Sequence, residues 1–369
     1  MKIGTLSLNI NTDDLNYGAV LHSWAFLKYI KKNGLAEEIE VIDYTTPLFE
    51  KFERNHPIQS YIKMRRWKSV GKLIFSASMY QKRLKKFEKF VEDNMKVSHK
   101  SYTQKTLEEE KLNYDCLICE SDVIWSPSFF KGKLDKVFFL GLDNMFNKKK
   151  IIYAASTANC DFSQKELEVF EQYIQFPNRI SCREKYGSEQ IRKCGRQDVE
   201  TVIDPVLLLE SNDYEAIMTE RIIREPYLLI YIPLGYDKRY QKVATEYAKK
   251  NHLKVVEISY YIWNSISHIV MADAGIKDFL SLIKHADVIF TNSFHAVCFS
   301  CIFQKEFYAF KRKTGKKTED LCERLALTER YMDIDDFQEK KRINYQIVEE
   351  RLKAERFNSE IWLKSALEM

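Results

Sequence analysis

Residues that could carry chemistry gather between His285 and Phe310, where the chain reads HADVIFTNSFHAVCFSCIFQKEFYAF. This stretch predicts a buried strand, a polar turn with Asn292 and Ser293, a helix that includes His295, and a second strand. Asn292 or Ser293 would cap the helix, so that its first N–H groups face the carboxyl end of the strand, where such sheets bind ligands. His295 therefore lies where chemistry is expected, and the alternative is a structural histidine satisfied within a helical turn.

Polar or charged side chains follow other predicted strands in the same way. Asp122 comes after residues 114–119, Arg183 after 180–182, and Asp204 after 200–203. Arg183 could clamp a carboxylate or a phosphate with two hydrogen bonds, or form a structural salt bridge. The two aspartates could equally cap helices or turns. Apolar strands that alternate with helices and end in polar residues predict an α/β protein with parallel sheets.

Composition describes an ordinary globular protein of more than one domain. The chain has 369 residues, 45% of them hydrophobic and 30% charged, which exceeds the usual size of a single core. The net charge of +5 is too small to indicate a partner. The first residues, MKIGTLSLNINTDDL, predict a strand rather than a secretion signal, so we expect a cytoplasmic protein with reduced cysteines.

A basic segment interrupts the strand and helix alternation. From Tyr61 to Lys89, ten Lys or Arg residues accompany a single acid, Glu88, and apolar residues recur at helical spacing. This predicts two amphipathic helices, within an insert of about residues 46–113, that either lie on an anionic membrane surface or pack their apolar stripe on the protein. Nucleic acid is disfavoured because the aromatic residues fall on the apolar stripe.

The spacing of two cysteine pairs invites a metal interpretation, which we reject. Cys116 and Cys119 fall on a predicted strand, where residues three apart point to opposite faces, and Cys298 and Cys301 fall on an apolar helix. We therefore expect no metal site.

Seven stretches taken together resemble the polysaccharide pyruvyl transferase family. They are NYGAVLHSWAFLKYI (16–30), ICESDVIWSP (118–127), YAAS (153–156), ISCREKYGSEQIRKCG (180–195), VIDPVLLL (202–209), ADVIFTNSFHAVCFSCIFQKEF (286–307) and LCERLALTER (321–330). The resemblance implies a glycosyltransferase-B-like (GT-B-like) fold: α/β, with two Rossmann-like domains facing a cleft and the basic helical insert in the first. It also implies transfer of pyruvate from phosphoenolpyruvate to a sugar, with no cofactor.

The resemblance implies roles for particular residues. His295 and Arg183 match the family's key histidine and arginine, and His295 would be the general acid that protonates carbon. Asp122 or Glu120 would accept the sugar hydroxyl's proton. Lys317, Asn292 and Ser293 would join Arg183 in binding the donor. The remaining positions, on the acceptor side, are Asn16, Tyr17, Gly18 and Asp204.

The chain also departs from the family pattern. His22 stands where Gln is common, the usual GSDQ is Glu120-Ser121-Asp122-Val123, the usual SFHG ends in Ala296, and Lys317 replaces an Arg. Two alternatives stay open: a nucleotide-sugar-dependent glycosyltransferase and, because of the altered loop at 120–123, a non-catalytic relative that binds glycan or membrane.

The predicted organisation is an acceptor-side domain over residues 1–210, a donor-side domain over 211–342, and a helix over 343–369 that packs back across the domains. The expected acceptor is a galactose or a related hexose of a lipid-linked or nucleotide-linked precursor of capsule or exopolysaccharide. The basic residues 61–89 would then contact the inner face of the cell membrane as a peripheral attachment.

Overall fold

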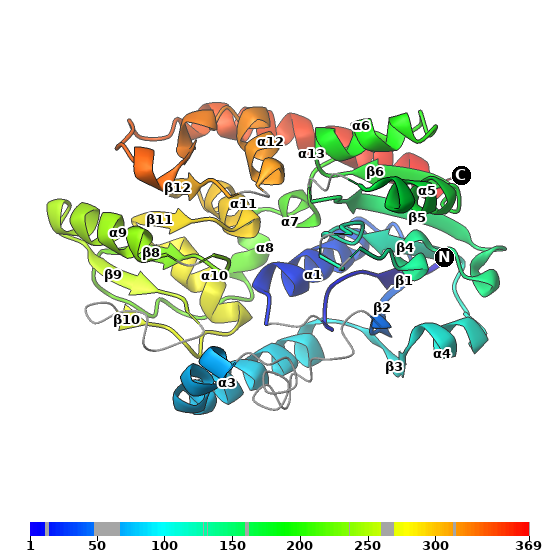
Figure 1. Cartoon of the computed structure of the whole chain (residues 1–369), viewed down its shortest axis with the longest axis horizontal. Coiled ribbons are helices and arrows are strands. Elements are labelled where there is room, and N and C mark those ends of the chain that lie inside the picture. The colour runs from blue at the N-terminus through cyan, green and yellow to red at the C-terminus, as the bar shows by residue number, and fades with distance from the viewer. Residues whose placement is uncertain are drawn as a thin grey trace. The chain divides into compact units, whose positions relative to one another are not determined.

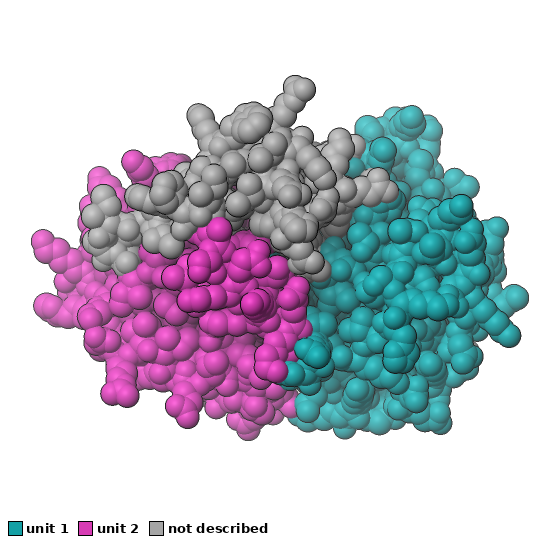
Figure 2. All heavy atoms as spheres, turned by 90° about the horizontal axis from the view of Figure 1, so that it is seen from below, with its two compact units in different colours: residues 1–50, 91–209, 352–369 teal, residues 51–90, 210–351 magenta. Residues whose placement is uncertain are grey.

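The chain forms two compact units, each assembled from separate segments of sequence. A computed structural model describes residues 1–11, 15–47, 67–127, 129–130, 132–158, 162–235, 237–259, 269–312 and 315–368. Within residues 67–127, the side chains are described from residue 76 onward. Unit 1 comprises residues 1–50, 91–209 and 352–369, and unit 2 comprises 51–90 and 210–351 (Figures 1 and 2).

Unit 1 is built on a seven-stranded sheet, in which every recorded pair of neighbouring strands is parallel. Its strand order is β3-β2-β1-β4-β5-β6-β7. The strands are β1 (Lys2–Leu6), β2 (Glu38–Tyr44), β3 (Val97–Tyr102), β4 (Cys116–Glu120), β5 (Lys149–Ala155), β6 (Arg179–Cys182) and β7 (Glu200–Thr201). Its helices include α1 (Tyr17–Lys32), α4 (Gln104–Glu109), α5 (Gln164–Tyr173), α6 (Lys185–Lys193) and α7 (Pro205–Leu208).

Unit 2 repeats the arrangement with six parallel strands in the order β10-β9-β8-β11-β12-β13. They are β8 (Tyr227–Tyr231), β9 (Lys254–Glu257), β10 (Ile269–Val270), β11 (Val288–Thr291), β12 (Glu306–Phe310) and β13 (Tyr331–Met332). Its helices include α8 (Ser211–Glu215), α9 (Lys238–Lys250), α10 (Ile276–His285), α11 (Phe294–Ile302) and α12 (Lys316–Arg324).

Apolar residues on both faces of each sheet explain why these strands lie at the centre of their units. β4 and β8 are buried at every position, as expected for parallel strands covered by helices on both sides. In unit 1 the indole of Trp125 stacks on Phe139 at 5.0 Å between ring centroids, within one large apolar cluster. The prediction of an α/β fold with two parallel sheets is therefore confirmed.

The basic insert differs from its prediction. Its described part begins with one helix, α3 (Trp67–Asn94), where two were expected, and residues 61–66 lie outside the described residues. Residues 51–90 group with unit 2, where Lys86 Nζ binds Asp278 Oδ2 at 2.8 Å, and not with the first domain. The insert also contains strand β3, whose sequence VSHKSY has no buried run because this strand lies at the sheet's edge.

The apolar stripe of α3 packs on the protein where its side chains are described. Tyr80, Leu84, Phe87 and Phe90 are buried, whereas the lysines at 82, 85 and 89 are exposed. This arrangement follows the second alternative of the sequence analysis, in which the stripe packs against the protein. None of the helices in the described stretches is long and apolar enough to cross a lipid bilayer.

The last helix, α13 (Tyr345–Glu368), begins in unit 2 and ends in unit 1. In unit 1, Ser359 Oγ accepts a hydrogen bond from the backbone N–H of Ile203 at 3.0 Å. Arg356 Nε donates to the carbonyl of Leu207 at 2.6 Å, and Trp362 is buried beside Tyr153. The end of α13 is therefore an integral part of unit 1.

Candidate active site

A cluster of buried polar side chains lies where strands β4 and β6 of unit 1 end. We call it the unit 1 cluster, and it consists of His22, Ser23, Glu120, Ser121, Asp122, Arg183, Glu184 and Asp204. The carboxyl ends of neighbouring parallel strands meet at one edge of a sheet, which explains how residues so distant in sequence come together. Four predicted site residues meet here: Glu120, Asp122, Arg183 and Asp204.

Arg183 is the cation at one end of the cluster, and its side chain is fully buried. Its Nη1 donates to Asp204 Oδ2 at 2.7 Å, and its Nη2 lies 3.5 Å from Asp122 Oδ1. Glu184 Oε2 lies 3.8 Å from Nε. Burial lowers the pKa of Arg183, but Asp204, Asp122 and Glu184 outweigh it and raise the pKa, so the guanidinium stays charged. Its charge is thus balanced by protein carboxylates.

His22 and Glu120 form a second buried ion pair. His22 Nδ1 lies 2.7 Å from Glu120 Oε2, and the hydroxyl of Ser23 donates to the other carboxylate oxygen. Burial lowers the pKa of His22, but the carboxylate of Glu120 outweighs it and raises the pKa to about 9. Burial raises the pKa of Glu120, and His22 opposes this effect. The pair therefore keeps the histidine protonated at neutral pH.

Asp122 sits at a strained turn between these two cations. Ser121 and Asp122 have φ values of 52° and 58°, in the left-handed region that non-glycine residues rarely occupy. The turn is held by hydrogen bonds from Ser121 N to the carbonyl of Tyr153 at 2.7 Å and from Ser156 N to the carbonyl of Asp122 at 3.0 Å. Strain maintained in this way is characteristic of functional sites.

The first loop contributes a helix cap. The side chain of Asn16 accepts hydrogen bonds from the N–H groups of Gly18 and Ala19 and thereby starts α1. Tyr17 is fully buried and Gly18 is buried, while Asn16 is half-buried. Asp204 caps α7 through Val206 N at 3.1 Å, in addition to binding Arg183. The predicted alternative of a helix cap is therefore present for this aspartate.

The predicted donor residues of unit 2 collect at the start of α11. Ser293 is the N-cap, and its hydroxyl accepts from Ala296 N at 3.4 Å. Asn292 instead donates to the carbonyl of Leu234 at 2.6 Å. His295 is 7% exposed and its ring contacts Phe294, over which Lys317 Nζ lies at 5.7 Å from the ring centroid. A helix N-terminus, an ammonium group and an imidazole are thus grouped around Phe294.

The structure reveals partners that the sequence interpretation missed. His22 was noted only as a departure from the family pattern, and Ser23, Ser121 and Glu184 were not singled out. His22 and Ser23 are two adjacent polar residues within an apolar helix that buries most of its length. This pattern could have identified His22 and Ser23 as members of a buried polar cluster, because a buried polar side chain needs a hydrogen-bond partner.

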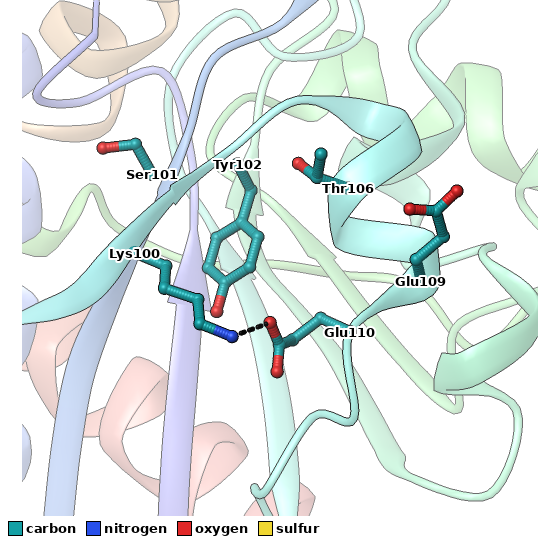
Figure 3. A pocket seen from close by; sticks show the side chains of 6 residues that line it. All are labelled: Lys100, Ser101, Tyr102, Thr106, Glu109 and Glu110. Carbon is teal, nitrogen blue, oxygen red and sulfur yellow. Dashed lines mark hydrogen bonds and ion pairs between the residues drawn. The ribbon is translucent and has the colours of Figure 1, made fainter.

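A solvent-exposed hollow in unit 1 lies apart from the predicted residues. It has a volume of about 520 Å³ and is lined by Lys100, Ser101, Tyr102, Thr106, Glu109 and Glu110 of β3, α4 and the residue after α4 (Figure 3). Lys100 Nζ binds Glu110 Oε2 at 2.7 Å beside the ring of Tyr102 (Figure 3). It contains none of the candidate site residues.

No cluster of metal ligands is found in the described residues: no group of three or more His, Cys, Asp or Glu side chains is arranged to hold an ion. Cys116, Cys119, Cys298 and Cys301 are all buried. Burial raises the pKa of Cys116 and of Cys301 to about 12, so these thiols behave as small apolar groups.

Comparison with known proteins assigns the family. The profile of the polysaccharide pyruvyl transferase family matches residues 16–314, which include every candidate site residue except Lys317. The chain therefore belongs to the polysaccharide pyruvyl transferase family, and it is an enzyme of that family. No curated protein matches it.

Solved structures are similar in fold at low sequence identity. UGT89C1 of Arabidopsis thaliana complexed with UDP-L-rhamnose has 9% identity and a TM-score of 0.52, over 99% of this chain and 98% of its own. UDP-GlcNAc 2-epimerase from Methanocaldococcus jannaschii has 11% identity and a TM-score of 0.48, over 96% and 92%. Heptosyltransferase WaaC of E. coli with ADP has 10% identity and a TM-score of 0.41, over 96% and 100%. The first likeness shows that the fold is GT-B-like.

Proposed function

We propose that this enzyme transfers pyruvate from phosphoenolpyruvate to two hydroxyls of a sugar and forms a cyclic ketal. Membership of the polysaccharide pyruvyl transferase family is the observation that carries the proposal. The grouping of His295, Lys317 and the N-terminus of α11 supports it, because the donor is an anion that must be protonated at carbon.

The reaction sets the requirements for each residue. A proton added to the methylene carbon of phosphoenolpyruvate leaves a methyl group and an oxocarbenium-like carbon, which a sugar hydroxyl attacks with loss of its proton. Inorganic phosphate then leaves, and the second hydroxyl adds to the same carbon and closes the ring. One donor and one diol thus give one ketal and one phosphate, with no oxidant, reductant or metal in the balance.

We assign the donor to the residues at the start of α11 and to Lys317. His295 is the proposed general acid, since an imidazole exchanges protons near neutral pH. Lys317 supplies positive charge beside it, and Ser293 fixes the helix whose N-terminus favours an anion. Asn292 holds the preceding turn through the carbonyl of Leu234. Together they meet the need for a cationic cradle.

We propose that the unit 1 cluster lies on the side of the site that binds the sugar acceptor. Asp122 is the group that accepts the hydroxyl proton, and Asn16, Tyr17, Gly18 and Asp204 form or support its surroundings. Because Glu120 is fully buried against His22, we assign it an indirect role. Arg183 is also fully buried, so we propose that it acts on the donor indirectly, by holding Asp122 and Asp204.

The proposed acceptor is a galactose or a related hexose of a lipid-linked or nucleotide-linked precursor of a bacterial capsule or exopolysaccharide. The exposed lysines at 82, 85 and 89 of α3 would favour an anionic surface such as the inner face of the cell membrane. Replacing these three by Gln should lower activity on a lipid-linked acceptor and leave activity on a soluble one unchanged. Equal loss on both acceptors would contradict this role.

Thermal stability with each donor tests the proposed reaction. A ligand that binds only the native state raises the melting temperature. Phosphoenolpyruvate should raise the melting temperature when no sugar is present, and Lys317→Ala should reduce this shift. A shift with the nucleotide-sugar alone would favour a glycosyltransferase, the second candidate, which the likeness of fold to UGT89C1 suggests. Binding of liposomes without any phosphate release would favour a non-catalytic relative.

A further inference from the structure

We propose that His22 and Glu120 are positioning residues that depend on each other: as a buried ion pair, they hold the carboxylate of Asp122 in its working position. This inference rests on the proposed function, because it assigns Asp122 the hydroxyl proton. It goes further by giving a role to two residues whose side chains are fully buried and that both depart from the family pattern.

The hydrogen-bond partners of His22 favour a charged imidazole. Nδ1 of His22 faces the carboxylate of Glu120 at 2.7 Å, and Nε2 faces the carbonyl oxygen of Leu8 at 3.3 Å. With Glu120 ionised, both partners are acceptors, so both ring nitrogens carry a proton and the ring is an imidazolium. The raised pKa of His22 agrees with that conclusion.

The imidazolium then acts on Asp122. Its Nε2 lies 3.9 Å from Asp122 Oδ2, while Arg183 Nη2 lies 3.5 Å from Asp122 Oδ1. Each carboxylate oxygen therefore faces one cation, and the cations come from two different elements, α1 and the end of β6. Val123 N also donates to Oδ1 at 2.8 Å. These contacts hold the left-handed turn at Asp122 and favour the ionised form that can accept a proton.

The charged groups near His22 in the described residues come from three elements, and the segment after β1 adds only the carbonyl of Leu8. Glu120 ends β4 and Asp122 lies in the turn after it, and Asp204 caps α7. Arg183 and Glu184 come directly after β6. Glu120 is the one that lies within hydrogen-bond distance of the ring. Without its charge the buried imidazole should lose a proton, and Asp122 should lose one of its two cations.

The first measurement is the NMR titration of the His22 imidazole in the intact protein, assigned with His22→Gln. The wild-type ring should stay protonated well above pH 7, and in Glu120→Gln it should titrate below the ordinary histidine range. His99→Gln is the matched control, because His99 is exposed on β3 of the same unit. A His22 ring that is neutral at pH 7 in the wild type would overturn the proposal.

The second measurement is phosphate release from phosphoenolpyruvate as a function of pH. His22→Gln and Glu120→Gln should each lower turnover about tenfold and move the acidic limb of the profile to higher pH, with the binding of phosphoenolpyruvate kept. The double variant His22→Gln/Glu120→Gln should be no slower than either single variant, because each single change already removes the imidazolium from beside Asp122. A simple loss of stability would not move the acidic limb.

The outcomes separate this inference from the proposed function. If the wild type releases phosphate, but the losses of turnover in the two single variants add up in the double variant and the acidic limb does not move, the inference is wrong and the proposed function stands. No phosphate release by the wild type would overturn the function, and the dependence of His22 on Glu120 would then be decided by the titration together with a denaturation cycle on the same variants. Additive losses of stability in that cycle would show that His22 does not depend on Glu120.

Discussion

The ion pair of His22 and Glu120 links the stability of unit 1 to pH. The pKa of His22 is raised from 6.5 to about 9, so the folded protein binds more protons than the unfolded chain in this range. The stabilisation is fully present below pH 6.5 and is lost as the pH rises through about 9. It is worth on the order of 3 kcal/mol, from 1.36 kcal/mol for each unit.

Denaturation at several pH values checks this expectation. The free energy of unfolding should fall between pH 6.5 and 9 in the wild type, and this fall should be absent in Glu120→Gln. Burial also raises the pKa of Glu120, which adds a loss of the same sign that begins at lower pH. A wild-type profile that is flat or rises over this range would contradict the assignment.

Replacement of His295 tests the proposed general acid. His295→Gln keeps a polar side chain of similar size at the start of α11 but cannot deliver a proton. Turnover should fall by roughly 10²- to 10⁴-fold, the usual contribution of general acid catalysis. Phosphoenolpyruvate should still raise the melting temperature, since Lys317 and the helix N-terminus remain. Full turnover in this variant would exclude His295 as the acid.

At the scale of residues, the strand ends predicted that certain polar side chains lie at one edge of the sheet, but not which residues each of them contacts. Asp122, Arg183 and Asp204 were each identified because they follow an apolar strand, and the structure brings them together. That Arg183 would be enclosed by carboxylates was not predictable, because an isolated position in a sequence does not reveal which distant strand lies beside it.

The packing of α6 on β6 depends on a glycine in the first turn of the helix. A Cβ at Gly187 would lie 2.8 Å from Cys182 Sγ and 3.2 Å from Glu184 Oε1, and Glu184 itself accepts from Thr157 N at 3.0 Å. Gly187→Ala should therefore cost about 1–3 kcal/mol of stability through overpacking. Denaturant unfolding measures the loss.

Cys182→Ala provides the control for this clash. It removes the sulfur that a methyl group at position 187 would meet, so the double variant should be more stable than the sum of the two single losses predicts. Additive losses would mean that the methyl group disturbs the carboxylate of Glu184 and not the thiol.

Elements with a strong apolar period were predictable, and those without one were not. The buried strand predicted ahead of Asn292 is present as β11, and the helix predicted to include His295 is present as α11. β3 was missed because its edge position leaves its polar residues exposed. Within the described part of the insert, the single long helix α3 replaces two expected ones, because no strong breaker follows residue 71 to mark a boundary.

On the scale of the whole molecule, removing residues 352–369 should unfold unit 1 selectively. That segment buries Trp362 and Leu363 and provides the contacts of Arg356 and Ser359 to the region around α7. Amide hydrogen exchange should show lost protection in β5 and β6 and retained protection in β8 and β11. Ile361→Ala, at an exposed position of the same helix, is the control and should change neither. Equal loss in both sheets would contradict the expectation.

The division of unit 1 into three segments determines the order in which the chain can fold during its synthesis. Every residue of unit 2 has been made by residue 351, whereas unit 1 lacks its last segment until 352–369 have followed. At about 5–20 residues per second, tens of seconds pass between the synthesis of strands β1 and β2 and the synthesis of the end of α13. The unit that contains the first residue is thus the last to be completed, and its apolar strands are the part of the nascent chain that chaperones would need to protect.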